Sequence, residues 1–448
     1  MLTPRDFGLA AMVWVFLGFA LMFADSGLSA ATVQRRNVTP NQLSTVHWTN
    51  IAVACVVAII CSLGTPLWVT YYHEPALANL VPWAALTFVV GAFGQQFQAV
   101  AQRELQFQRM AMSDTLGVVA GFLASIIAAF LGAGVYSLIF GGLISATVKA
   151  GWISITGWRL WRPSWHWKKG DLTGLLGFGG FQIGDRTLNY IWNNADYMLI
   201  GRLLGSDALG LYRLAFETVV RPLETINPIV NKISYPVFAI KQTENAVLRK
   251  GFLEIVRFIA SAVSPMMAGL CAVAPWAVAA LFGAKWSSIT VLLQILSPYG
   301  LLRALLNPTA LINVANGRIR YVFCLNLTLA CVLPLGFWFS ARYGLLMFCL
   351  TEVLLLAIVM ILAWRPLHRS SFGLSAGDHL LAVAKPVILS LSMGVCVYGL
   401  SLFLPASWSP VLTLCVLIGA GICLYCLLLT KFDLPYLRRV MRLVRGDA

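Results

Sequence analysis

Charged side chains are scarce in this sequence. Only 11% of its 448 residues are Asp, Glu, Lys or Arg, whereas 59% are hydrophobic; a soluble domain carries roughly 25% charged residues. Acidic residues are the rarer kind, 17 against 32 Lys and Arg, which gives a formal net charge of +15. A chain this poor in charge cannot cover a water-exposed surface, so the composition excludes a soluble enzyme and indicates an integral membrane protein.

The sequence also lacks the motifs of catalysis and of metal binding. Its five histidines are scattered, and it contains no H-E-x-x-H spacing, no P-loop and no nucleophile elbow. The ten cysteines lie in or beside apolar runs. Cys423 and Cys426 form a C-x-x-C that we interpret as two packing residues, because no βαβ pattern accompanies it. We therefore expect no enzyme, no metal site and no cofactor.

Apolar runs long enough to cross a bilayer fill most of the chain. A membrane-spanning helix needs about 20 mostly apolar residues. The fold class we expect is an all-α polytopic membrane protein with about 13 transmembrane helices. The spans are placed at residues 8–32, 45–71, 76–99, 112–133, 135–157, 173–198, 207–232, 253–281, 288–313, 320–341, 343–364, 381–404 and 409–430.

Lys and Arg are distributed unequally over the connections between these spans. One alternating set of connections is rich in them, whereas the opposite set, with the amino terminus, holds only Arg5, Arg202, Lys285 and Arg342. Positive charge is retained on the cytoplasmic side of a membrane, so we expect Met1 outside and the carboxyl terminus inside. The basic tail could then contact anionic membrane lipids. Because the charge is dispersed over many segments, we expect no nucleic-acid partner.

Two of the spans carry polar side chains along one helical face. Spacings of three and four residues bring such side chains to the same side of a helix. An ionisable group facing hydrocarbon costs roughly 2.5 to 3.5 kcal/mol, so we expect both faces to line a hydrated space walled by protein. The residues are Gln182, Arg186, Asn189, Asn193 and Asp196 in span 173–198, and Arg213, Glu217, Arg221 and Glu224 in span 207–232.

A weak internal repeat organises the chain. Residues 2–10 and 204–212 share a pattern that ends in a glycine followed by Leu, and the two copies lie 202 residues apart. An even number of spans separates them, which gives both copies the same orientation, as in parallel repeats. We expect two pseudo-symmetric helical lobes around a central cavity. The boundaries are 1–170 for the amino-terminal lobe, 171–366 for the carboxy-terminal lobe, 367–430 for two trailing helices and 431–448 for a cytoplasmic tail.

A set of short motifs in a fixed order resembles the Wzx-type polysaccharide flippases of the multidrug, oligosaccharidyl-lipid and polysaccharide exporter superfamily. The motifs are at residues 2–9, 25–35, 194–205, 208–212, 235–238 and 281–286. The resemblance implies two six-helix lobes plus two trailing helices, fourteen in all, so the first helix is expected to be missing here. It also implies export of undecaprenyl-pyrophosphate-linked oligosaccharide across the bacterial inner membrane by alternating access, with a polysaccharide polymerase or glycosyltransferases as possible partners.

Such a cargo suggests roles for the intramembrane polar residues. A diphosphate requires cations that stay ionised, and Arg stays ionised while offering a planar set of donors. Sugars require amide partners. Carboxylates in low-dielectric surroundings can couple ions by alternating between protonated and ionised states. The alternative, that Glu217 only neutralises its arginine neighbours in a structural ladder, stays open. We assign Arg186, Arg213, Arg221 and Arg303 to the diphosphate, Gln182, Asn189 and Asn193 to sugars, and Asp185, Asp196, Glu217 and Glu224 to ion coupling.

Three other functions compete with this hypothesis. A lipid II flippase would differ only in cargo, and a multidrug or cation antiporter of the same superfamily would need a net acidic cavity. A membrane-embedded glycan polymerase generally needs a sizeable outer loop, which these short connections do not provide. Three further glutamines, Gln95, Gln98 and Gln102, share a face of span 76–99 and its continuation, where we expect ordinary solvation at the membrane interface.

Overall fold

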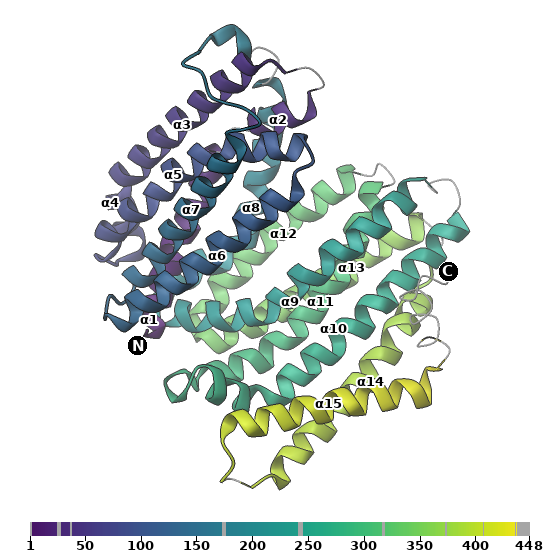
Figure 1. The fold of residues 1–448 in the computed structure, drawn as a ribbon. Coiled ribbons are helices and arrows are strands. Elements are labelled where there is room, and N and C mark those ends of the chain that lie inside the picture. The colour runs from purple at the N-terminus through teal and green to yellow at the C-terminus, as the bar shows by residue number, and fades with distance from the viewer. Residues whose placement is uncertain are drawn as a thin grey trace. The chain divides into compact units, whose positions relative to one another are not determined.

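The computed structural model describes residues 2–24, 28–35, 38–172, 176–240, 245–315, 319–371, 374–405, 407–434 and 436. Within these ranges the chain is helical and contains no β-strand, which confirms the all-α class (Figure 1). The first elements are α1 (Pro4–Ala24), α2 (Leu28–Gln34), α3 (Pro40–Leu63), α4 (Thr65–Tyr72), α5 (Leu77–Arg103), α6 (Phe107–Phe130), α7 (Tyr136–Gly157), the short 3-10 helix η1 (Lys169–Leu172) and α8 (Leu176–Leu203).

The elements of the second half are also helices. Its elements are α9 (Gly205–Ile240), α10 (Asn245–Leu281), η2 (Ala284–Trp286), α11 (Ile289–Ala315), α12 (Ile319–Ser340), η3 (Ala341–Tyr343), α13 (Leu345–Ser371), α14 (Ala376–Phe403) and α15 (Pro410–Phe432). Several begin at side-chain caps: the Ser375 and Ser409 hydroxyls accept hydrogen bonds from backbone N–H groups in the first turns of α14 and α15.

Eleven helices in the described part of the chain are long and apolar enough to cross a membrane. The polar helices α8 and α9, which contain the expected spans 173–198 and 207–232, are not among these eleven, so the total of thirteen stays a prediction. The expected continuous span 45–71 is interrupted at Gly64, where α3 ends and α4 begins. Pro66 lies in the first turn of α4, and a proline there cannot continue the hydrogen bonding of α3.

The chain divides into two compact units, residues 1–210 (unit 1) and 211–448 (unit 2). In unit 1, α5 packs against α3 and α7, and α6 packs along α7 (Figure 1). Helix α8 contacts α1 and therefore belongs to unit 1. The units are defined by packing, whereas the expected boundary at residue 170 was placed from the repeat; the functional lobes stay a prediction.

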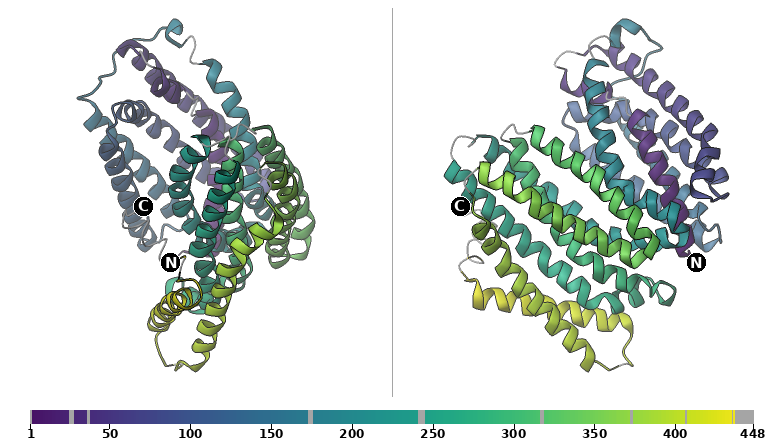
Figure 2. Two further views of the ribbon diagram at one scale, coloured as in Figure 1. Left: turned by 90° about the vertical axis from the view of Figure 1, so that its right-hand side faces the viewer. Right: turned by 180° about the vertical axis from the view of Figure 1, so that it is seen from behind.

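In unit 2, α10 is the central helix and contacts α11, α14 and α15. Figure 2 shows α14 and α15 as a helical hairpin alongside α10. Val273 and Ala277 of α10 pack with Met393 of α14 and Leu417 of α15 in one buried cluster. Close van der Waals packing of these side chains attaches the hairpin to α10.

Ion pairs reinforce this attachment at one end of the hairpin. Arg249 of α10 bonds Asp378 in the first turn of α14. Asp433, just after α15, accepts a hydrogen bond from Arg257 and lies 3.3 Å from the Lys385 ammonium nitrogen. Lys385, within the described part of α14, is thus paired with the buried carboxylate of Asp433.

The two copies of the internal repeat cross each other at their glycines. A Cβ atom placed on Gly8 would lie 1.7 Å from the Ser206 carbonyl oxygen, and one placed on Gly210 would lie 1.8 Å from the Pro4 carbonyl oxygen. Pro4 corresponds to Ser206, and Gly8 to Gly210, in the 202-residue repeat. The contact is therefore reciprocal: each copy places the residue that lies four positions before its own glycine against the glycine of the other. Only glycine permits so close an approach of two backbones.

Glu74, in the connection between α4 and α5, ties the two copies together. Its carboxylate accepts a hydrogen bond from the Arg5 guanidinium at 3.1 Å and from the Ser206 hydroxyl at 2.6 Å. Arg5 belongs to the first copy and Ser206 to the second. One acidic residue thus links the starts of α1 and α9 at the same end of the helices.

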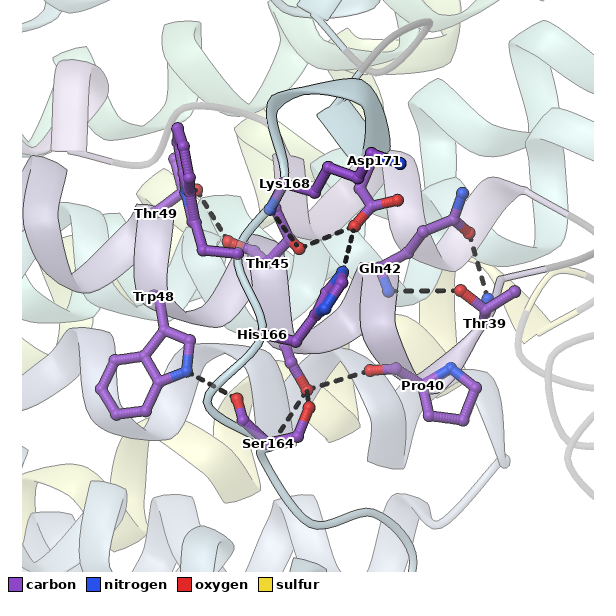
Figure 3. Close-up of polar contacts among 12 residues, drawn as sticks. Thr39, Pro40, Gln42, Thr45, Trp48, Thr49, Ser164, His166, Lys168 and Asp171 are labelled. Atoms are coloured by element: carbon purple, nitrogen blue, oxygen red, sulfur yellow. Dashed lines mark hydrogen bonds and ion pairs between the residues drawn. The ribbon is translucent and has the colours of Figure 1, made fainter.

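The segment that follows α7 crosses the start of α3 (Figure 3). We call this segment, residues 158–172 including η1, the strap. The Trp48 indole N–H donates to the Ser164 carbonyl at 2.8 Å, and the Thr45 hydroxyl donates to the Asp171 carboxylate at 2.9 Å. The Thr45 hydrogen bond holds the pKa of Asp171 below its ordinary value. The strap is therefore fixed to α3 by specific polar contacts.

Candidate functional site

The predicted polar face of α8 is only partly described. The side chains of residues 176–189 lie outside the described part of the chain, and with them the predictions for Gln182, Asp185, Arg186 and Asn189. Further along α8, Asn193 is half-buried and Asp196 is buried, with 4% of its surface exposed. Burial of Asp196 agrees with a helix face turned away from hydrocarbon, because an ionisable group there requires polar surroundings.

The predicted face of α9 forms a ladder of alternating charge. The Glu217 carboxylate accepts a hydrogen bond from Arg213 Nε at 2.7 Å through one oxygen and from an Arg221 terminal nitrogen at 3.1 Å through the other. Both arginines lie four residues from Glu217, the spacing at which helical neighbours meet. The Arg213 side chain is 23% exposed, whereas that of Arg221 is 71% exposed. The ladder thus runs from the half-buried Arg213 to the exposed Arg221.

Arg303 of α11 joins the same region of unit 2 through aromatic rings. Its guanidinium donates to the Tyr299 hydroxyl at 2.9 Å and lies 5.7 Å from the centre of the Phe216 ring of α9. The Phe216 and Tyr299 rings are themselves 5.5 Å apart. Phe216 immediately precedes Glu217 in α9, so Arg303 is held beside the ladder by cation–π contacts. We call Arg213, Arg221 and Arg303 the arginine cluster.

Among the described residues of the arginine cluster and of the polar face of α9, three cations accompany two anions. The arginine cluster is accompanied on α9 by Glu217 and by Glu224, which is exposed one turn beyond Arg221. Glu217 pairs with both Arg213 and Arg221, as expected if its role is to neutralise these arginines in a structural ladder. The remaining excess of one positive charge is suited to an anion, and planar guanidinium groups bind phosphate oxygens well.

A buried hydrogen bond between a tyrosine and a glutamate lies on another side of α9. The Tyr212 hydroxyl donates to the Glu352 carboxylate of α13 at 2.9 Å, and Glu352 is 3% exposed. Sequence reasoning did not single out Tyr212 or Phe216, although both fall on α9 at a spacing of four, next to the polar face. Aromatic residues at this spacing are usually ordinary core residues, so only the packing against α11 and α13 distinguishes them.

Unit 1 contains a second polar region that the sequence placed at the membrane interface. Gln95, Gln98 and Gln102 of α5 line a cavity of about 570 Å³, with Lys149 of α7 at its wall. Gln95 and Gln98 are half-buried beside this cavity and Gln102 is exposed, so the expectation of ordinary interfacial solvation stays a prediction. Among the described residues, no group of His, Cys, Asp and Glu could hold a metal ion.

The described helices, eleven of them long and apolar enough to cross a membrane, define this protein as a polytopic helical membrane protein. Two solved structures share the fold. The lipid II flippase MurJ in an inward closed conformation matches with a TM-score of 0.74 at 13% identity, over 98% of this chain and 94% of that one. An inward-facing multidrug resistance transporter of the MATE family, in the MOP superfamily, matches with a TM-score of 0.60 at 13% identity, over 82% of this chain and 95% of that one.

Within that class, the chain belongs to the family of polysaccharide biosynthesis proteins, which matches residues 1–291. It is 30% identical to the teichuronic acid biosynthesis protein TuaB of Bacillus subtilis over 92% of this chain and 86% of TuaB. It is 29% identical to the lipopolysaccharide biosynthesis protein WzxC of Escherichia coli over 89% of this chain and 82% of WzxC. The resemblance to Wzx-type polysaccharide flippases that the sequence motifs indicated is confirmed.

Proposed function

We propose that this protein is a flippase that moves polyprenyl-diphosphate-linked oligosaccharide units from the cytoplasmic to the outer leaflet of the bacterial inner membrane. The observation that carries the proposal is the arginine cluster of α9 and α11, in a helical transporter of the polysaccharide biosynthesis family. The lipid-linked precursor joins a diphosphate to sugars, and the cluster offers the planar donors that a diphosphate requires.

The geometry supports a specific division of roles within the cluster. Arg221 is the most exposed member and would meet the headgroup first. Arg303, held between two rings, would supply a fixed second contact. Glu217 would keep Arg213 and Arg221 in register when the site is empty. We assign Asn193 to sugar contacts and Asp196, Glu217 and Glu224 to possible ion coupling, with the undescribed Gln182, Asp185, Arg186 and Asn189 in the roles stated above.

Transport would proceed by alternating access, without a catalytic step. Moving about two negative charges outward, against a cell interior held negative, gains roughly 2.3 kcal/mol per charge per 100 mV. The basic connections would lie in the cytoplasm with the carboxyl terminus, by the positive-inside rule. A polymerase on the outer side or glycosyltransferases on the inner side are the partners that such a cargo implies.

The test is transport by the purified protein in liposomes that contain a fluorescent polyprenyl-diphosphate-linked glycan. Arrival at the opposite leaflet is scored by a membrane-impermeant quencher. Arg221→Ala and Arg303→Ala should each lower the transport rate about tenfold or more, because hydrogen bonds to charged groups contribute about 1.5 to 3 kcal/mol. Arg303→Lys should restore part of the rate, since the charge is kept while the donor fork is lost.

Arg342→Ala is the matched control. This arginine lies on η3 of the same unit, with its guanidinium 4.2 Å from the centre of the Trp338 ring. It should leave transport unchanged. Full activity of Arg221→Ala and Arg303→Ala would overturn the assigned role. Liposomes loaded with lipid II or with a cationic dye separate the alternative functions, because a lipid II flippase or a drug antiporter would move those cargoes instead.

A further inference from the structure

The cavity in unit 1 has the size of a small-molecule binding site. Its volume is about 570 Å³, and ligand sites in proteins span roughly 300 to 1,000 Å³. Small residues create the space: Gly91, Ala92 and Ala99 of α5 face Ala146 and Ala150 of α7. The cavity thus exists because the facing residues of the packed helices α5 and α7 have small side chains.

Amide groups dominate the polar part of its wall. Gln95, Gln98 and Gln102 follow each other at spacings of three and four along α5 and project from one face. Each side-chain amide both donates and accepts hydrogen bonds. The Phe88 ring and the Ile153 side chain supply an apolar part of the same wall. Paired donors and acceptors beside an apolar surface are what a sugar ring requires.

The one charged side chain described in the wall is paired. Lys149 is the only ionisable residue among the described residues that line the cavity, and its ammonium group lies 2.7 Å from the Asp114 carboxylate of α6. A diphosphate would need unpaired cations here, and a drug cation would need an acidic wall. An acyl chain would exclude water from the amides of Gln98 and Gln102 and offer them no hydrogen bond, at a cost of roughly 1 to 3 kcal/mol each.

The wall is held in place by a polar network behind it. Gln96 is fully buried, and its amide lies within 3.4 Å of the Ser29 and Thr32 hydroxyls of α2. Asn50 of α3 donates to the same Ser29 hydroxyl at 2.9 Å. These contacts fix the rotation of α5 and thereby keep the row of glutamines turned toward the cavity.

We propose that this cavity binds uncharged sugar rings of the transported glycan, with Gln95, Gln98 and Gln102 as hydrogen-bonding partners. The inference rests on the proposed flippase function and adds a glycan-binding site that is separate from the arginine cluster. The glutamines occupy the last turns of α5, which lead into the connection that contains Arg103. By the positive-inside rule this is the cytoplasmic end, where the cargo is loaded.

Gly91 permits a sharp test. It lines the cavity, and a Cβ atom placed on it would meet nothing within 4 Å, so a larger side chain can enter the cavity without a clash. Gly91→Leu should fill the site, and the double variant Gln98→Leu, Gln102→Leu should remove its hydrogen bonds. The control is Gly151→Leu on α7, where a Cβ atom also meets nothing within 4 Å but the residue does not line the cavity.

The assay compares two cargoes in liposomes: polyprenyl diphosphate carrying the glycan extracted from the host, and polyprenyl diphosphate carrying a single sugar. Both cavity variants should slow transport of the glycan cargo about tenfold, as expected for losing one to two hydrogen bonds, and should change the single-sugar rate less than twofold. Equal losses on both cargoes, or no loss on the glycan cargo, would overturn the glycan site. Wild-type protein that moves neither cargo would instead overturn the proposed function.

Discussion

At the scale of single residues, Glu352 is the most constrained acidic group that the structure describes in unit 2. Its carboxylate is almost fully buried in α13 and accepts a hydrogen bond from Tyr212 of α9. The Tyr212 ring also packs on Phe216 and Phe348. A buried carboxylate is tolerated only where donors surround it. The Tyr212 hydrogen bond connects α9 and α13 inside the protein, where water cannot take the place of the hydroxyl if it is removed.

Removing the Tyr212 hydroxyl should therefore destabilise the protein. We expect Tyr212→Phe to lower the free energy of unfolding by about 1 to 3 kcal/mol, the range for losing a hydrogen bond to a buried carboxyl group. Thermal unfolding of the purified protein in detergent measures the effect. Tyr343→Phe, on exposed η3, is the control and should unfold like the wild type. Equal melting temperatures for both variants would show that the buried hydrogen bond contributes little.

Residue-scale features differ in how far the sequence predicts them. The contacts among Arg213, Glu217 and Arg221 follow directly from a spacing of four on a helix, and the sequence predicted this ladder as the structural alternative. The position of Arg303 over Phe216 could not be predicted, because residues about 90 positions apart meet only through packing of α9 on α11. The same holds for Gln95, Gln98 and Gln102: their shared face was visible in the sequence, but the cavity that they line with residues of α7 was not.

At the scale of helices, the crossing of α1 and α9 is the tightest described contact between two elements. Gly8→Ala or Gly210→Ala would bring a methyl group within 2 Å of a carbonyl oxygen, a distance that real Cβ atoms do not adopt. The helices would have to separate, and the Glu74 bridge between Arg5 and Ser206 would be strained with them.

We expect each of these alanine substitutions to reduce the yield of folded protein severely, with a loss of stability of several kcal/mol typical of overpacking. The measurement is the monodisperse fraction in size-exclusion chromatography after extraction in mild detergent. Gly399→Ala in α14 and Gly419→Ala in α15 are matched controls, since a Cβ atom at either position meets nothing within 4 Å. Normal yield of Gly8→Ala would contradict the tight crossing.

Helix positions were predicted well where apolar runs are long, and less well where polar residues interrupt them. The expected spans 76–99 and 135–157 coincide closely with α5 and α7, because their apolar length alone specifies them. The run 45–71 was predicted as one helix, but Pro66 divides it into α3 and α4. The Thr39 capping box, in which Thr39 and Gln42 exchange hydrogen bonds, begins α3 earlier than hydropathy indicated.

At the scale of the whole molecule, the distribution of Lys and Arg makes a prediction about topology. Lys168, in the strap, and Lys285, on η2, are both exposed and belong to opposite sets of connections. In a cysteine-free chain, Lys285→Cys should react with an impermeant maleimide added outside spheroplasts, whereas Lys168→Cys should react only after permeabilisation. The reverse pattern would place the carboxyl terminus outside and contradict export from the cytoplasmic leaflet.

The fold class could be predicted from composition, whereas the fold itself required the order of motifs along the chain. A low charged fraction specifies a membrane protein but allows many helical arrangements. The repeat at residues 2–10 and 204–212 predicts two similar halves. It is a weak sequence signal because the crossing constrains few positions: a glycine and the backbone four residues before it.

The reciprocity of that crossing has a further meaning. In a two-fold symmetric homodimer, residue i of one subunit touches residue j of the other, and j touches i. Pro4 against Gly210 and Ser206 against Gly8 reproduce this rule inside one polypeptide. The two segments, 202 residues apart, therefore meet through the same pair of positions on each other, which is the geometry of a local two-fold axis between them.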